Sequence, residues 1–92
     1  MDQERIEVVQ MVRYLVAAGD WSKIYTKTLK EARRYAYFHT LSGAGNQTYI
    51  YSDTDRIVGR VHRSGGMRYW TDSKGKMYWL ENDGTTTAIT SR

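Results

Sequence analysis

The first part of the chain has apolar residues at the spacing of an amphipathic helix. In residues 4–18 (ERIEVVQMVRYLVAA) the polar positions fall between the members of one wide apolar stripe, which consists of Ile6, Val8, Val9, Met11, Val12, Leu15 and Val16. This pattern predicts a helix over residues 4–18. Gly19 would end it. Its apolar face would either join the core or form a dimer seam.

A second helix is predicted by a capping box that follows a connector at residues 20–27, where a short strand is expected around Ile24 and Tyr25. Thr28 is followed three residues later by Glu31, so that its hydroxyl would accept the Glu31 amide while the carboxylate reaches back to the Thr28 amide. The helix should run over residues 29–41 and end in a loop at residues 43–45.

The two sides of this second helix differ in character. One side, expected to pack on a sheet, carries Leu29, Ala32, Tyr35, Ala36 and His39. The opposite side, expected to face outward, carries Lys30, Arg33, Arg34 and Tyr37. The outward side is either a binding surface or a solvated helix face.

From residue 46 onward the pattern changes to short segments rich in Thr, Tyr, Trp, Val and Ile, separated by Gly, Asn, Asp and Ser. Such segments predict strands joined by hairpins. We expect four strands and a fifth at the C-terminus, over about residues 47–90. The predicted fold is α+β: a single domain, residues 1–92, in which two N-terminal helices pack on one face of a four- to five-stranded antiparallel meander sheet.

Two glycine turns predict the strand register. Gly75 fits the left-handed position of a three-residue hairpin loop, and Gly65-Gly66 fits a two-residue turn. The resulting pairs are Tyr69 with Trp79, Trp70 with Tyr78, His62 with Tyr69 and Val61 with Trp70.

This register separates two faces, because successive side chains of a strand alternate. The more apolar face, expected to meet the helices, holds Ile57, Gly59, Val61, Trp70, Tyr78 and Leu80. The other face, expected to meet solvent, holds Val58, Arg60, His62, Met67, Tyr69, Met77 and Trp79. The arginines and lysines at 60, 63, 68, 74 and 76 would lie on or beside this solvent face.

The amino-acid composition indicates a recognition surface and favours an anionic partner. The 92 residues include eight Tyr and three Trp but one Phe, and Tyr and Trp are enriched at interfaces as well as in strands. The net charge of +4 is uneven: residues 1–20 carry two basic and four acidic groups, whereas residues 21–92 carry twelve basic and six acidic groups. This asymmetry favours nucleic acid, or an acidic or nucleic-acid-binding protein surface, as partner.

The sequence contains no motif that is typical of an enzyme active site or of a metal-binding site. The chain has no cysteine, and His39 and His62 lack zinc-ligand spacing. Asp53-Thr54-Asp55 suits a hairpin turn better than a calcium loop. We therefore expect a non-enzymatic protein without metal or cofactor. No long apolar run or signal peptide is present, so we expect no membrane partner and a cytoplasmic location.

The capped TLKEARRYAYFHTLSG helix, the amphipathic segment before it and the short-stranded sheet together resemble small accessory proteins that bacteriophages encode, particularly the anti-CRISPR proteins acting on type I effector complexes. The resemblance implies a non-enzymatic inhibitor that acts in the cytoplasm of a bacterial host. It would bind an RNA-guided surveillance complex, contacting Cas subunits and guide RNA, and block recognition of target DNA.

Two alternatives stand beside the inhibitor. One is a small basic RNA- or DNA-binding regulatory domain of a phage or mobile element, because basic residues interleaved with aromatic ones on a sheet are typical of single-strand binders. The other is a structural or oligomeric phage protein whose first predicted helix forms the seam between copies. The candidate partner-binding residues are Lys30, Arg33, Arg34, Tyr37, Arg60, His62, Arg63, Arg68, Tyr69, Lys74, Lys76 and Trp79.

Overall fold

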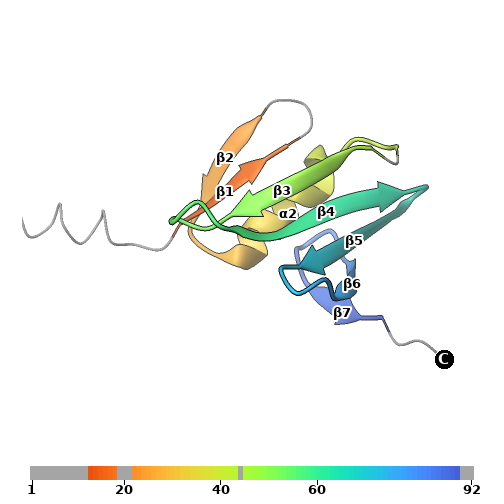
Figure 1. The fold of residues 1–92 in the computed structure, drawn as a ribbon. Coiled ribbons are helices and arrows are strands. Elements are labelled where there is room, and N and C mark those ends of the chain that lie inside the picture. The colour runs from red at the N-terminus through yellow and green to blue at the C-terminus, as the bar shows by residue number, and fades with distance from the viewer. Residues whose placement is uncertain (1–12, 19–21, 44, 90–92) are drawn as a thin grey trace, which may run out of the picture.

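The computed structural model describes residues 13–18, 22–43 and 45–89, which form one antiparallel sheet with a helix on one face (Figure 1). The strands lie side by side in the order β2-β1-β3-β4-β5-β6-β7. Their bounds are β1 Tyr14–Ala17, β2 Lys23–Thr26, β3 Gln47–Tyr51, β4 Ile57–Ser64, β5 Met67–Asp72, β6 Met77–Leu80 and β7 Thr86–Ala88; the helix α2 spans Leu29–His39.

The predicted arrangement of two helices on a four- to five-stranded sheet is wrong. The described residues form a single helix and a seven-stranded antiparallel sheet, so the domain is mostly sheet. The helix predicted over residues 4–18 fails at Tyr14–Ala17, which is strand β1; residues 1–12 and Gly19 lie outside the described residues. Leu15 and Val16 fit a strand because β1 pairs on both sides, with β2 and β3, and Val16 is completely buried.

The second helix is confirmed, but it ends at His39, two residues earlier than predicted, and one bond of its cap differs. Thr28 Oγ1 accepts the Glu31 amide at 3.1 Å, as the capping box predicts. Glu31 Oε1, however, accepts from the Lys27 amide at 3.3 Å and from the Thr28 hydroxyl at 3.4 Å, instead of from the Thr28 amide. The short strand expected around Ile24 and Tyr25 is also present, as β2.

The core lies between α2 and the sheet. Two alanines of the helix allow close approach to the strands, and the strands contribute larger side chains. The buried apolar residues are Val16, Ala32, Ala36, Ile50, Val61, Trp70 and Leu80. Removal of their apolar surface from water is the main driving force for this packing.

The C-terminal meander follows the predicted register. The five strands expected there are β3 to β7, and Tyr69 pairs with Trp79 while Val61 pairs with Trp70. Gly75 adopts a φ of +89° in the β5–β6 turn, where the Gly75 amide donates to the Asp72 carbonyl at 3.0 Å. The turn chemistry therefore sets which side chains share a face.

A β-bulge changes the predicted faces at the start of β4. Ile50 pairs with Gly59, but Tyr51 pairs with Ile57, so Val58 is the extra residue. The bulge reverses the alternation: Ile57 is 50% exposed on the far side from α2, and Val58 packs against the core. The predicted faces of these two residues are wrong for this reason; the other assignments to the apolar face hold.

Candidate functional site

The face of the sheet opposite α2 is not covered by any described element (Figure 1). We call it the open face. Val16, Ile50 and Val61 are buried on the helix side, and successive side chains of a strand point to opposite faces. Together with the strand pairing, this identifies the residues of the open face. They are Leu15, Ala17, Lys23, Tyr25, Gln47, Tyr49, Tyr51, Ile57, Arg60, His62, Met67, Tyr69, Thr71, Met77, Trp79 and Thr87.

Three rings form a stack across the open face. His62, Tyr69 and Trp79 are directly paired across β4, β5 and β6. The ring centroids of His62 and Tyr69 lie 5.3 Å apart with planes 21° from parallel, and those of Tyr69 and Trp79 lie 5.1 Å apart at 33°. Such offset aromatic pairs stabilise each other beyond their buried area. The sheet therefore holds the rings in fixed positions.

The stack has two outer ring faces. On the β4 side the neighbour of His62 in the register is Gln47, and on the β6 side the neighbour of Trp79 is Thr87. Thr87 is short, exposed and part of the edge strand β7. The indole of Trp79 is partly buried, and its neighbour on the β7 side is a small side chain, beside which a flat ligand can lie.

Two further tyrosines and an arginine lie on β3 and β4. Tyr49 pairs with Arg60, and the ring centroids of Tyr49 and Tyr51 are 6.5 Å apart. Because Arg60 and His62 follow each other on this face of β4, the guanidinium lies beside the ring stack. Aromatic and cationic groups thus share one surface.

The electrostatics of the open face favour an anionic ligand. Lys23 and Arg60 are its strand cations, and none of its strand residues carries a carboxylate. Arg13 precedes β1, and its guanidinium carbon lies 6.0 Å from the Tyr25 ring centroid. The nearby acidic residues, Asp53 and Asp55, belong to the β3–β4 turn at one end.

His62 is neutral near pH 7. Partial burial, and secondarily the positive charge of Arg60, lower the pKa of His62 below its ordinary value of 6.5. Its Nε2 lies 3.3 Å from the Thr71 hydroxyl, which is itself buried on this face. The ring therefore contributes stacking area rather than charge at neutral pH.

The candidate binding residues predicted on the helix do not form one surface. Lys30 and Arg34 are exposed, as expected. Arg33 instead turns toward the sheet: its Nε donates to the Gly84 carbonyl at 2.8 Å, and its guanidinium carbon lies 5.5 Å from the Trp70 ring centroid. Burial lowers the pKa of Arg33. The prediction that Arg33 faces outward is wrong because Trp70 offers it an aromatic face.

Tyr37 and Arg68 also differ from their predicted positions. Tyr37 packs against the core. Arg68 has the same strand parity as Trp70, so it lies on the helix side of the sheet; its Nε donates to the Tyr37 carbonyl at 3.2 Å and its guanidinium lies 4.4 Å from the Tyr37 ring centroid. Arg63 pairs with Arg68 and lies on the same helix side. These contacts join α2 to the sheet.

The two lysines of the β5–β6 turn lie at the end of the sheet. The backbone amides of Lys74 and Lys76 each donate to Asp72 Oδ1 at 2.9 Å. Both hydrogen bonds lower the pKa of Asp72, and the bond from the Lys76 amide has the larger effect. The Lys76 ammonium lies 5.5 Å from the ring of Tyr78, on the helix side. Only Arg60, His62, Tyr69 and Trp79 of the predicted residues therefore belong to the open face.

Several residues of the open face were missed by sequence reasoning. Tyr49 and Tyr51 alternate with the buried Thr48 and Ile50, and this alternation could have found them. Leu15 could not have been found in this way, because residues 4–18 fit a helical stripe. Tyr25 lies in the short strand that the sequence predicts, but its place on the open face depends on the pairing of β2 with β1.

Within the described residues, no group of three or more His, Cys, Asp or Glu side chains is arranged to hold a metal ion, and no helix is both long and apolar enough to cross a membrane. No family model, curated protein or solved structure matches the chain.

Proposed function

We propose that the protein is a non-enzymatic binding module whose open face recognises single-stranded RNA or DNA. The observation that carries the proposal is the stack of His62, Tyr69 and Trp79 on the open face, whose described strand residues include cations and no carboxylate. Single-strand binders combine these two elements: bases stack on aromatic rings, and cations attract the phosphates.

The geometry favours single strands over duplexes. In a duplex the bases stack on one another and hide their faces, whereas an unpaired base can lie against the Trp79 ring on the side of Thr87. Arg60 lies two residues from His62 along β4, on the same face, and is placed to meet the backbone of the bound nucleic-acid strand. A base on Trp79 and phosphates near Arg60 together define a short binding site.

Binding of a short oligonucleotide tests the proposal. Fluorescence anisotropy with a labelled six-nucleotide single strand measures the affinity for one copy of the protein. Trp79→Ala should weaken binding roughly 5- to 150-fold, because stacking of one base is worth about 1–3 kcal/mol. Trp79→Phe keeps a ring and should lose less. Phe38→Ala, on the other side of the sheet, is the matched control and should bind as the wild type does.

The salt dependence supplies an independent test. If about two phosphates are neutralised, the logarithm of the affinity should fall with the logarithm of the salt concentration with a slope of about −1.4. Arg60→Gln should make this slope shallower. An affinity that does not depend on salt, or equal affinities for wild type and Trp79→Ala, would refute binding through the open face.

We propose as a second function that the protein inhibits a type I RNA-guided surveillance complex. The observation that favours it is the exposed apolar area on the open face: Ile57, Met67 and Met77 are 40–50% exposed. Methionine and aromatic residues are enriched at protein interfaces. The test is target-DNA binding by a purified surveillance complex: stoichiometric protein should abolish it, and Met77→Glu should restore it. Unchanged DNA binding would refute this proposal without affecting the first.

A further inference from the structure

The side of α2 that faces away from the sheet exposes large apolar side chains, and among them is Tyr35, which the sequence wrongly predicted to pack on the sheet. Phe38 is 62% exposed, Tyr35 43% and Leu41, just beyond the helix, 45%. A helix that packs one side on a sheet normally presents polar residues on the other. Clustered apolar residues on a surface mark an interaction site. This site lies on the opposite side of the sheet from the open face, so it calls for a separate explanation.

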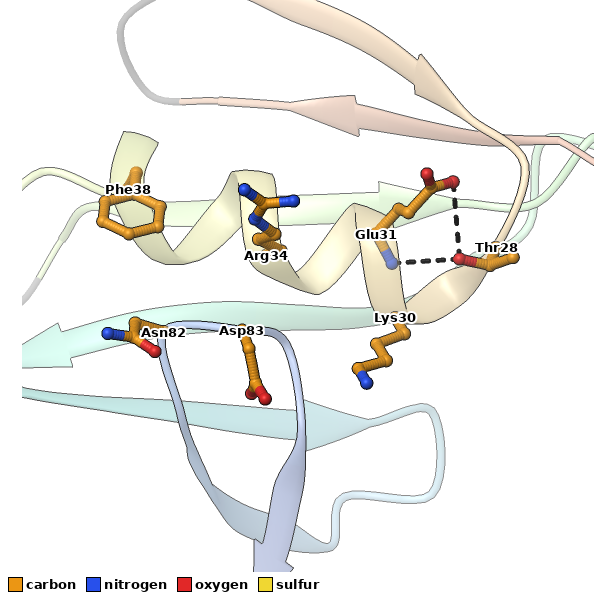
Figure 2. A pocket seen from close by; sticks show the side chains of 7 residues that line it. All are labelled: Thr28, Lys30, Glu31, Arg34, Phe38, Asn82 and Asp83. Atoms are coloured by element: carbon orange, nitrogen blue, oxygen red, sulfur yellow. Dashed lines mark hydrogen bonds between the residues drawn. The ribbon is translucent and has the colours of Figure 1, made fainter.

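Two hollows flank this side of the helix. One lies between α2 and the β6–β7 turn and is lined by Lys30, Arg34, Phe38, Asn82 and Asp83, together with Thr28 and Glu31 (Figure 2). The other is lined by Glu31, Arg34, Tyr35, Phe38 and His39. Glu31, Arg34 and Phe38 line both hollows and therefore form a ridge between them. A surface with a ridge beside a hollow can be self-complementary: in a twofold dimer the ridge of each copy packs into the hollow of the other.

The β6–β7 turn fixes the first hollow. Gly84 is buried against α2 so closely that a Cβ there would meet the Lys30 carbonyl oxygen, and Arg33 Nε donates to the Gly84 carbonyl. The charge of Lys30 contributes to lowering the pKa of Asp83 across this hollow, although the hydrogen bonds from Thr85 lower it more. The first hollow thus holds charges of both signs.

The charges along the ridge are self-complementary. Glu31 lies near the start of α2 and Arg34 one turn later, and both line each hollow. Suppose that two copies of α2 pack antiparallel, centred between Arg34 and Tyr35. Phe38 of one copy then lies opposite Glu31 of the other, beside the second hollow. Arg34 lies about 6 Å along the axis from the other copy's Glu31, within reach of its side chain.

We propose that two copies of this chain associate through α2. Phe38 of each copy is seated in the second hollow of the other copy, and Arg34 pairs with the other copy's Glu31. Phe38 supplies the apolar anchor of such an interface, and Arg34 contributes orientation. Because α2 covers the face opposite the ring stack, this dimer leaves both open faces directed outward.

Sedimentation velocity over a wide range of protein concentration tests the proposal. The wild type should sediment as a dimer at high concentration, and Phe38→Glu should reduce the association constant at least tenfold. Arg34→Glu places two carboxylates near each other across the interface and should also weaken association. Tyr25→Glu is the matched control, since Tyr25 is 65% exposed on the open face; this variant should remain dimeric. Far-UV circular dichroism of each variant verifies that the fold is kept.

Three results would overturn the proposal. One is a wild type that stays monomeric at all concentrations; another is a dimer that Tyr25→Glu dissociates while Phe38→Glu does not. The third is a monomer that captures a different protein through Phe38, which would assign the ridge to that protein. None of these results changes the oligonucleotide assay, because a six-nucleotide strand reports on single copies.

Discussion

Gly59 is the position where one added methyl group should be most damaging. It is buried in β4 on the helix side of the sheet, beneath the indole of Trp70. A Cβ at this position would lie 2.5 Å from both Trp70 Cζ2 and the Thr71 carbonyl oxygen. Carbon atoms in favourable contact are about 3.5–4.0 Å apart. Gly59→Ala therefore requires the indole or the neighbouring strand to move by about 1 Å.

Neither neighbour can move freely. Trp70 is 4% exposed and lies under the Arg33 guanidinium, and the Thr71 carbonyl is part of the backbone of a central strand. Overpacking of a core costs about 1–3 kcal/mol. Since both neighbours are fixed, we expect a loss near 3 kcal/mol in the free energy of unfolding. For a domain of this size that corresponds to a melting temperature lower by about 12 °C or more.

Urea unfolding followed by circular dichroism measures the loss, and Gly66→Ala is the matched control. A Cβ at Gly66 has no neighbour within 4 Å, so this variant should be unchanged or more stable by up to about 1 kcal/mol. If Gly59→Ala lost less than about 1 kcal/mol, Trp70 would not lie over Gly59. The assignment of the two faces of the sheet would then be refuted.

Three further predictions concern single side chains. Trp70→Ala should cost about 3–5 kcal/mol of stability because its side chain is buried. Trp79→Ala should cost less, because Trp79 is only partly buried and loses mainly its ring contact with Tyr69. The reverse order would contradict the face assignment. Thr28→Ala removes the cap of α2 and should cost about 1 kcal/mol in the same assay, and no loss would show that the cap is not formed. Because folding lowers the pKa of His62, the unfolded chain takes up this proton first, and its contribution to stability is lost as the pH falls below about 6.5. Melting temperatures of His62→Gln should therefore fall less between about pH 7 and pH 5 than those of the wild type, and parallel curves would contradict this.

The sequence was sufficient to predict the C-terminal sheet where glycine turns determine the register. Gly75 requires a left-handed conformation, which fixes the β5–β6 loop and so places Trp70 and Trp79 on opposite faces. The cap at Thr28 likewise gave the start of α2 from local chemistry alone. Short-range rules work in these segments because the deciding contacts lie within a few residues.

Strand β1 was not predictable by the same rules. Its four residues, Tyr14–Ala17, continue a stripe that fits a helix, and what makes them a strand is pairing with β3, more than 30 residues away. The bulge at Val58 and the inward turn of Arg33 over Trp70 also depend on distant partners. Long-range pairing therefore changed the fold class, and it added Tyr25 and Leu15 to the open face.

Amide chemical shifts during titration with a six-nucleotide single strand test the central claim most directly. The proposal predicts that shifts concentrate at Arg60, His62, Tyr69 and Trp79 on the open face, while residues of α2 such as Ala32 stay unchanged. Shifts concentrated on α2, or no shifts at an excess of oligonucleotide, would contradict nucleic-acid recognition by this face.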